Sequence, residues 1–287
     1  MEFWFSELHT PNVKFSVKVD RQLYSEENEY VRLDIFDSPE LGRFLTIDGY
    51  IILTERDEFI YHEMLTHIPM AVHPNPEKIL VFGAGDGGVV RELLKYPDVK
   101  KIDMVEVNEG VLEASKKYLP FTASGLTDPR VTIYTENCLR YIRHIEQEYD
   151  VIIVDSAGFY GPGESLLSRE FYGSCYKALK EDGIMVNQHQ SPFYDEDRLE
   201  TQKAHKRIVE SFPISRVYQA HIPSYPSGYW LFGFASKKYH PVKDLKTKHW
   251  KNLDIETRYY TTNLHKGCFA LPAYVEQMLE DVENIPD

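Results

Sequence analysis

From residue 78 onward, strand-sized apolar segments alternate with segments of helical periodicity. Strands are predicted at 79–82, 102–107, 131–134, 151–154, 184–188, 217–222 and 230–235, and helices at 88–95, 109–118, 139–145, 168–179 and 196–212. This alternation predicts an α/β fold with a doubly wound, mostly parallel sheet. A ligand of such a sheet binds beyond the carboxyl ends of the strands, near the point where the strand order reverses.

The first part of the chain has a different pattern. Residues 13–19 and 29–36 alternate between apolar and polar, and the segments 44–47 and 50–53 flank a hairpin turn at Asp48-Gly49. Residues 57–72 then change to a helical period. We therefore predict an amino-terminal β domain at residues 1–56. A Rossmann-like domain at 57–287 would include a carboxy-terminal extension that packs against it.

Charge and cysteine content exclude several classes of protein. The chain has 32 Lys and Arg against 45 Asp and Glu, a formal net charge of −13, which disfavours nucleic-acid binding. Cys138, Cys175 and Cys268 are too few and too far apart for a disulfide framework or a paired-cysteine zinc site. No segment is long and apolar enough to cross a membrane, and the first residues lack an export signal. We expect a cytoplasmic protein with neither nucleic acid nor membrane as a partner.

A glycine-rich segment, GAGDGG, lies between the first predicted sheet strand and the next helix. Gly83, Gly85 and Gly88 match the dinucleotide-binding fingerprint, and Glu106 ends the next predicted strand, where an acid can bind a ribose diol. Asp86 adds a carboxylate at the amino terminus of this helix. Its negative charge disfavours a pyrophosphate and favours a ligand that carries a positive charge. A sulfonium nucleoside, S-adenosylmethionine or a relative, satisfies both acids; alternatively, Asp86 only caps the helix.

Asp155 follows the strand at 151–154 and opens a glycine-rich loop at the catalytic edge of such a fold. A primary amine is protonated at neutral pH, and freeing its lone pair costs about 4–5 kcal/mol. A carboxylate that accepts this proton and aligns the amine with an electrophilic carbon lowers the barrier. Tyr61, on the first helix, and Tyr225, in a proline-braced loop, are further candidates.

We predict no metal site at the two histidines of the first helix. His62 and His67 are five residues apart, which separates them by about 140° around a helix. The zinc-protease spacing of four residues separates its histidines by only about 40°.

Together these residues make the sequence resemble the polyamine aminopropyltransferases, the spermidine synthase family. The resemblance covers nearly the whole chain, and the matching segments are 57–64, 83–88, 105–107, 128–131, 154–156, 161–162, 223–228, 259–260 and 264–266. It implies a methyltransferase-like Rossmann fold with a small amino-terminal β-sheet domain, assembled as a homodimer or homotetramer. It also implies a transferase of polyamine biosynthesis.

The implied reaction moves an aminopropyl group from decarboxylated S-adenosylmethionine, a co-substrate rather than a bound cofactor, to an amine. By default putrescine becomes spermidine and methylthioadenosine is released. The resemblance assigns donor binding to Gly83, Gly85, Asp86, Gly87, Glu106, Asn137 and Cys138. It assigns acceptor binding to Tyr61, His62, Asp155, Gly158, Gln190 and Tyr225. Asp155 would be the base, assisted by Tyr61 and Tyr225, with Glu106 at the ribose and Asp86 at the aminopropyl ammonium.

Several positions depart from the family pattern. Gly158 and Gln190 stand where the family has acids that face the cationic acceptor, and Val31 replaces a glutamine near the donor. Asn137 replaces an aspartate at the adenine and can still bond the adenine amino group through its carbonyl. Because a charged hydrogen bond contributes about 1.5–3 kcal/mol, putrescine should bind worse than in an ordinary family member.

Two other functions remain open on the residues alone. A diverged paralogue would use S-adenosylmethionine itself, for methyl or aminocarboxypropyl transfer to a less cationic acceptor. A binding or regulatory protein would keep the nucleoside pocket without turnover. The nucleoside product distinguishes these possibilities.

Overall fold

A seven-stranded sheet forms the centre of the computed structural model, which describes residues 2–27, 31–156, 166, 168–280 and 282. Its strands are β7 (Lys78–Gly83), β8 (Lys101–Val105), β9 (Val131–Tyr134), β10 (Tyr149–Asp155), β11 (Leu179–Gln188), β12 (Ile214–His221) and β13 (Tyr229–Ser236). They lie in the order β12-β13-β11-β10-β7-β8-β9, and within this sheet β13 runs antiparallel to both of its neighbours. The strand order reverses between β7 and β10. This confirms the predicted doubly wound, mostly parallel sheet.

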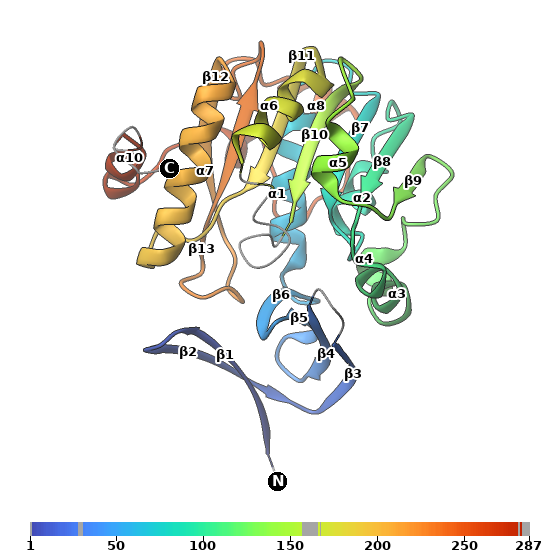
Figure 1. Cartoon of the computed structure of the whole chain (residues 1–287), viewed down its shortest axis with the longest axis vertical. Helices are drawn as coiled ribbons and strands as arrows, with labels where there is room; N and C mark the ends of the chain where they lie inside the picture. Colours follow the sequence, from blue (N-terminus) through green and yellow to red (C-terminus); the bar gives the residue numbers. More distant parts are fainter. Residues whose placement is uncertain (1, 28–30, 157–165, 167, 281, 283–287) are drawn as a thin grey trace.

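Helices cover both faces of this sheet (Figure 1). The helices are α1 (Glu58–Met70), α2 (Gly88–Leu93), α3 (Glu109–Tyr118), α4 (Pro120–Ala123), α5 (Cys138–Ile142), α6 (Arg169–Ala178), α7 (Asp195–Ser211), α8 (Thr247–Asn252), α9 (Thr262–Gly267) and α10 (Ala273–Glu280). In β7, Ile79 and Val81 share a buried core with α1 and α2, whereas Leu80 and Phe82 share one with α5 and α6. Because successive residues of a strand face opposite sides, a strand covered on both sides must be apolar throughout.

The amino-terminal strands form two small antiparallel sheets. One pairs β1 (Phe3–Thr10) with β2 (Val13–Val19), and the other contains β3 (Arg21–Glu27), β4 (Arg32–Ser38), β5 (Gly42–Ile47) and β6 (Tyr50–Thr54). Figure 1 shows these strands beneath the central sheet. Leu33 and Leu45 of the four-stranded sheet pack against Val111 of α3. The small sheets therefore cover the edge of the central sheet where a ligand is expected.

The carboxy-terminal segment is held by one buried carboxylate of α1. Glu63 accepts hydrogen bonds from the backbone N–H groups of Arg258, Tyr259 and Tyr260 at 2.7, 2.8 and 2.7 Å. Trp250 and Tyr260 are buried in the same core as α1. This confirms that the segment packs against the Rossmann-like body. No helix in the described part of the chain is long and apolar enough to span a membrane.

The structure shifts several predicted boundaries. Leu179 begins β11 rather than ending the preceding helix, and β8 ends at Val105, so Glu106 lies one residue beyond its strand. Of the predicted strand at 29–36, residues 29 and 30 lie outside the described residues. The strands β1 and β3 and the helices α4, α8, α9 and α10 were not predicted. These helices have four to eight residues, too short for stability without tertiary packing, so periodicity carries little signal there.

Candidate active site

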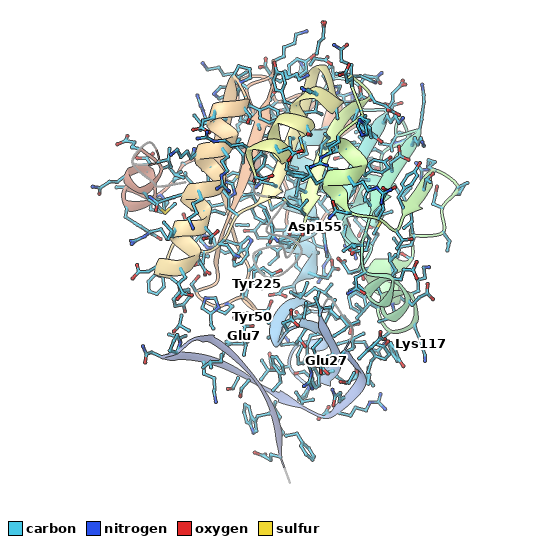
Figure 2. The ribbon with its side chains drawn as sticks, in the orientation of Figure 1. Glu7, Glu27, Tyr50, Lys117, Asp155 and Tyr225 are labelled. Atoms are coloured by element: carbon cyan, nitrogen blue, oxygen red, sulfur yellow. The ribbon has the colours of Figure 1, made fainter. Side chains whose placement is uncertain are left out.

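One cavity lies between the carboxyl ends of the central strands and the amino-terminal sheets. Figure 2 shows Asp155, Tyr225, Tyr50 and Glu7 in this region, and all four line the cavity. The sequence-predicted site residues that line it are Tyr61, His62, Gly83, Gly85, Asp86, Glu106, Asn137, Cys138, Asp155, Gln190 and Tyr225. Gly87 is not among the lining residues, and Gly158 lies outside the described residues. The fold thus brings together residues separated by more than a hundred positions in the sequence.

The glycine-rich loop connects β7 to α2 and runs directly beside the end of β10. At Gly83, where φ is +77°, a Cβ atom would lie 2.0 Å from the backbone oxygen of Asp155. Gly87 has a φ of +88° and provides the N-cap of α2. Only glycine adopts such angles readily, and only glycine leaves room for so close a contact. The loop geometry therefore places Asp86 and Asp155 in the same part of the cavity.

Glu106 follows β8 and lies in the cavity wall. Its carboxylate accepts the backbone N–H of Asn108 at 2.8 Å, and a Cβ atom on Gly85 would lie 3.0 Å from Glu106 Oε2. Burial, together with the nearby Asp155 and Asp86, raises the pKa of Glu106 to about 7. Hydroxyl donors of a ribose would satisfy this buried carboxylate.

Asn137 and Cys138 line the cavity near the start of α5. The side-chain oxygen of Asn137 accepts the backbone N–H of Arg140 at 3.0 Å and caps the helix. One lone pair of this oxygen therefore remains for an adenine amino group. Burial raises the pKa of the Cys138 thiol to about 12, so it is a neutral group at physiological pH.

Asp155 is the last residue of β10. Its Oδ1 accepts a hydrogen bond of 2.7 Å from the Tyr61 hydroxyl. Its Oδ2 is buried and has no hydrogen-bond partner among the described residues. Burial and the nearby Asp86 raise the pKa of Asp155 to about 7, while His62 and Tyr61 act in the opposite direction. A carboxylate with one unoccupied oxygen and a pKa near neutrality can accept a proton from a ligand.

The structure corrects the predicted contact of Tyr225. This side chain lies beside Tyr61, with ring centroids 6.3 Å apart, but its hydroxyl donates to the backbone oxygen of Ile52 at 2.5 Å. Asp57, at the start of α1, accepts hydrogen bonds from the N–H and hydroxyl of Ser224 in the same loop. Tyr225 is thus anchored to the amino-terminal sheet, whereas the Tyr61 hydroxyl is the one that donates to the Asp155 carboxylate among the described tyrosines.

His62 lines the cavity and lies between two carboxylates. Its Nδ1 lies 2.6 Å from Glu58 Oε2, and its Nε2 lies 3.2 Å from Asp86 Oδ1. Although burial opposes protonation, Asp86 and Glu58 raise the pKa of His62 to about 10. The His62 charge in turn holds the pKa of Asp86 below its usual range despite burial. Asp86 also accepts the N–H of Gly88, so it caps α2 in addition to lining the cavity.

The two histidines of α1 have separate surroundings. His67 lies 2.8 Å from the Tyr96 hydroxyl and 3.1 Å from Glu92, away from the cavity lining. His62, Asp86 and Asp155 each place a potential ligand atom within 4.8 Å of the others. Two carboxylates at this distance in a cavity can also bind an organic cation such as an ammonium group.

A second charged group in the cavity wall was not predicted. His9 of β1 lies 3.3 Å from Glu7 and 3.2 Å from Asp197 of α7, and all three line the cavity with Gln190. Although burial opposes protonation, Asp197 and Glu7 raise the pKa of His9 to about 9. Residues 9 and 197 are 188 positions apart. No local motif links them, and only the alternation of β1 could have indicated that Glu7 points inward.

This fold and this site define a transferase of the methyltransferase-like Rossmann class. Two family models match the chain: the spermidine synthase tetramerisation domain over residues 3–55 and the spermine/spermidine synthase domain over residues 58–247. The chain belongs to the spermine/spermidine synthase family.

Curated relatives match the chain over its whole length. A polyamine aminopropyltransferase of Alkaliphilus oremlandii is 58% identical over 284 residues, covering 99% of this chain and 100% of the relative. One of Clostridium perfringens strain SM101 is 57% identical with the same coverage.

Solved structures of spermidine synthases are similar to this chain in both fold and sequence. A spermidine synthase in complex with the transition state analogue AdoDATO has a TM-score of 0.94 and 43% identity, covering 97% of this chain and 95% of that one. The spermidine synthase of Thermotoga maritima has a TM-score of 0.91 and 43% identity, covering 97% and 94%.

Proposed function

We propose that this protein transfers an aminopropyl group from decarboxylated S-adenosylmethionine to an amine, with putrescine as the default acceptor. Spermidine and methylthioadenosine would be the products. The observation that carries the proposal is one cavity lined by three acids: Glu106, placed to bind a ribose, Asp86, placed to bind a cation, and Asp155. One carboxylate oxygen of Asp155 has no hydrogen-bond partner in the part of the chain that the structure describes. Family membership supports this reaction.

The donor would occupy the side of the cavity formed by the glycine-rich loop. Glu106 would accept the ribose hydroxyls, and Asn137 and Cys138 would lie at the adenine. Asp86 would bind the aminopropyl ammonium, because it is a buried carboxylate whose pKa lies below its usual range. Gly83 and Gly85 would allow the backbone to approach the nucleoside closely.

Asp155 would act as the general base on the acceptor nitrogen. The amine loses a proton to the carboxylate, and its lone pair attacks the aminopropyl carbon bonded to sulfur. The new C–N bond forms as the C–S bond breaks, and the bonding electrons neutralise the sulfonium. Tyr61 would orient Asp155 through their 2.7 Å hydrogen bond. Tyr225 would shape the acceptor side of the cavity from its anchored position.

The direct test is to incubate the purified protein with decarboxylated S-adenosylmethionine and a panel of amines. We expect methylthioadenosine and the aminopropylated amine in equal amounts. Release of S-adenosylhomocysteine from S-adenosylmethionine would instead indicate methyl transfer. Nucleoside binding with no product from any amine would contradict the proposal.

Aminopropyl transfer is favoured over the use of S-adenosylmethionine itself. The relatives reported above are named polyamine aminopropyltransferases, and a spermidine synthase 43% identical to this chain is in complex with a transition state analogue. No comparable observation supports methyl or aminocarboxypropyl transfer.

Gln190 stands where the family has an acid, and this difference gives a prediction about how tightly the acceptor binds. Gln190 lines the cavity and is buried, so Gln190→Glu would add a carboxylate there for a second ammonium. Since charged hydrogen bonds contribute about 1.5–3 kcal/mol, we expect KM for putrescine to fall about tenfold. The matched variant Gln190→Ala should give no such gain. An unchanged KM in Gln190→Glu would show that this position does not face the acceptor.

We also propose that the chain assembles as a homo-oligomer, a dimer or a tetramer, through its amino-terminal strands. Residues 1–56 would form one domain and residues 57–287 the other. Strand β1 leaves Phe3, Trp4 and Leu8 exposed by 59%, 57% and 58%. Light scattering should give a mass above that of one chain, and Trp4→Glu should lower it. A monomeric wild-type protein would contradict this assignment.

A further inference from the structure

Four charged side chains form a continuous network beside the cavity: the half-buried Arg91 and the buried Glu58, His62 and Asp86. The two terminal nitrogens of Arg91 donate to the two carboxylate oxygens of Glu58, each at 2.9 Å. His62 lies between Glu58 and Asp86, at 2.6 and 3.2 Å. Glu58, His62 and Asp86 are all buried. Each charge in the network therefore has a partner of the opposite sign.

The position of the His62 ring is also fixed by packing. It lies against the first residue of α2, where a Cβ atom on Gly88 would be 2.3 Å from His62 Cε1. The third glycine of the fingerprint thus makes room for an imidazole in this chain. Packing and hydrogen bonding together leave the ring one orientation, with Nδ1 toward Glu58 and Nε2 toward Asp86.

We propose that Glu58 and Arg91 are positioning residues that hold His62 as a fixed imidazolium between Asp86 and Asp155. This inference rests on the proposed function, in which Asp86 binds the donor and Asp155 is the base. Arg91 orients Glu58, and Glu58 orients His62 and stabilises its charge. None of these actions requires contact with a substrate.

The fixed positive charge of His62 offsets the repulsion between two nearby carboxylates in the cavity. His62, Asp86 and Asp155 lie within 4.8 Å of one another, and two carboxylates this close cannot both ionise easily without a nearby cation. The groups that face His62 are Glu58 and Tyr61 from α1, Asp86 from the glycine-rich loop and Asp155 from β10. His62 is the positive member of this group. Its charge therefore keeps Asp86 ionised and allows Asp155 to be a carboxylate near neutral pH.

The test is Glu58→Gln, which keeps the shape of the side chain and removes its charge. In the wild type, NMR of labelled histidine should show no titration of His62 between about pH 6 and 9; in Glu58→Gln, His62 should titrate in this range. As His62 becomes neutral, the pKa of Asp155 rises. The acidic limb of the pH profile of kcat/KM should therefore move up by about one pH unit.

Glu58→Asp, which retains the charge, is the matched control and should keep the acidic limb where it is in the wild type. Two results together would overturn the proposal: Glu58→Gln lowers the rate by the same factor at every pH, and the titration of His62 does not change. Glu58 would then have only a structural role. The NMR titration needs no turnover. Absence of product from the wild type would thus contradict the proposed function without deciding this inference.

Discussion

Asp155→Asn should lower kcat about 10²- to 10⁴-fold, the range measured for removal of a positioned general base. Asparagine fits the same space and can still accept the Tyr61 hydrogen bond, but its amide cannot take a proton from an ammonium. The loss should appear in the chemical step, because the proposed function assigns donor binding to other residues of the cavity. Single-turnover release of methylthioadenosine measures that step directly.

The pH profile provides a second measurement on the same residue. Only the carboxylate form of Asp155 can act as a base, so kcat/KM for the amine, measured with the donor saturating and Glu106 therefore occupied, should fall below a pH of about 7, where the Asp155 carboxyl becomes protonated. This limb should be absent from the residual activity of Asp155→Asn. The matched control is Asp98→Asn, an exposed position, which should change neither rate nor profile. Wild-type rates in Asp155→Asn would exclude Asp155 as the base.

Asp86→Asn should weaken binding of decarboxylated S-adenosylmethionine by about ten- to a hundredfold, because a charged hydrogen bond to the donor ammonium is lost. The asparagine oxygen can still accept the N–H of Gly88, so α2 should keep its cap. Isothermal titration with the donor measures the effect.

Methylthioadenosine supplies the control for Asp86, since it has the same nucleoside but no ammonium. Its affinity should be nearly the same in Asp86→Asn and in the wild type. An equal loss of affinity for both ligands would show that Asp86 maintains the shape of the loop and does not bind the donor ammonium. Unchanged affinity for both would place the donor ammonium elsewhere.

Local sequence signals indicated the central sheet and most of the cavity-lining residues of the glycine-rich segment and the strand that follows it. The glycines at 83, 85 and 88 lie within six consecutive residues from the end of β7 to the start of α2, and Glu106 follows the next strand, so periodicity and spacing were sufficient. Short helices such as α8 and α9 were missed because tertiary packing stabilises them. The inward-facing Glu7 and the His9–Asp197 pair were missed because their neighbours come from distant parts of the chain.

Tertiary structure also added hydrogen-bond partners to predicted site residues that line the cavity. Tyr225 lies in the cavity as expected, but its hydroxyl is bonded to Ile52 of a different sheet. His62 was assigned to the acceptor, yet Glu58 and Asp86 occupy both of its nitrogens. The contact between Glu58 and His62 joins residues four apart on α1, so helix spacing could have indicated it. The contacts of His62 with Asp86 and of Tyr225 with Ile52 join different elements, and spacing along one helix does not specify them.

By itself, the sequence determined the fold class, the edge of the sheet that binds the ligand, and the acids that line it. These follow from periodicities of two and 3.6 residues and from loop glycines, all of which act over short distances along the chain. Only the tertiary structure decided which acid has a raised pKa, which acid lies beside a histidine, and which carboxylate oxygen has no hydrogen-bond partner among the described residues. The reason is that ionisation in a buried cavity depends on charges a few ångströms apart in space, whatever their separation in sequence.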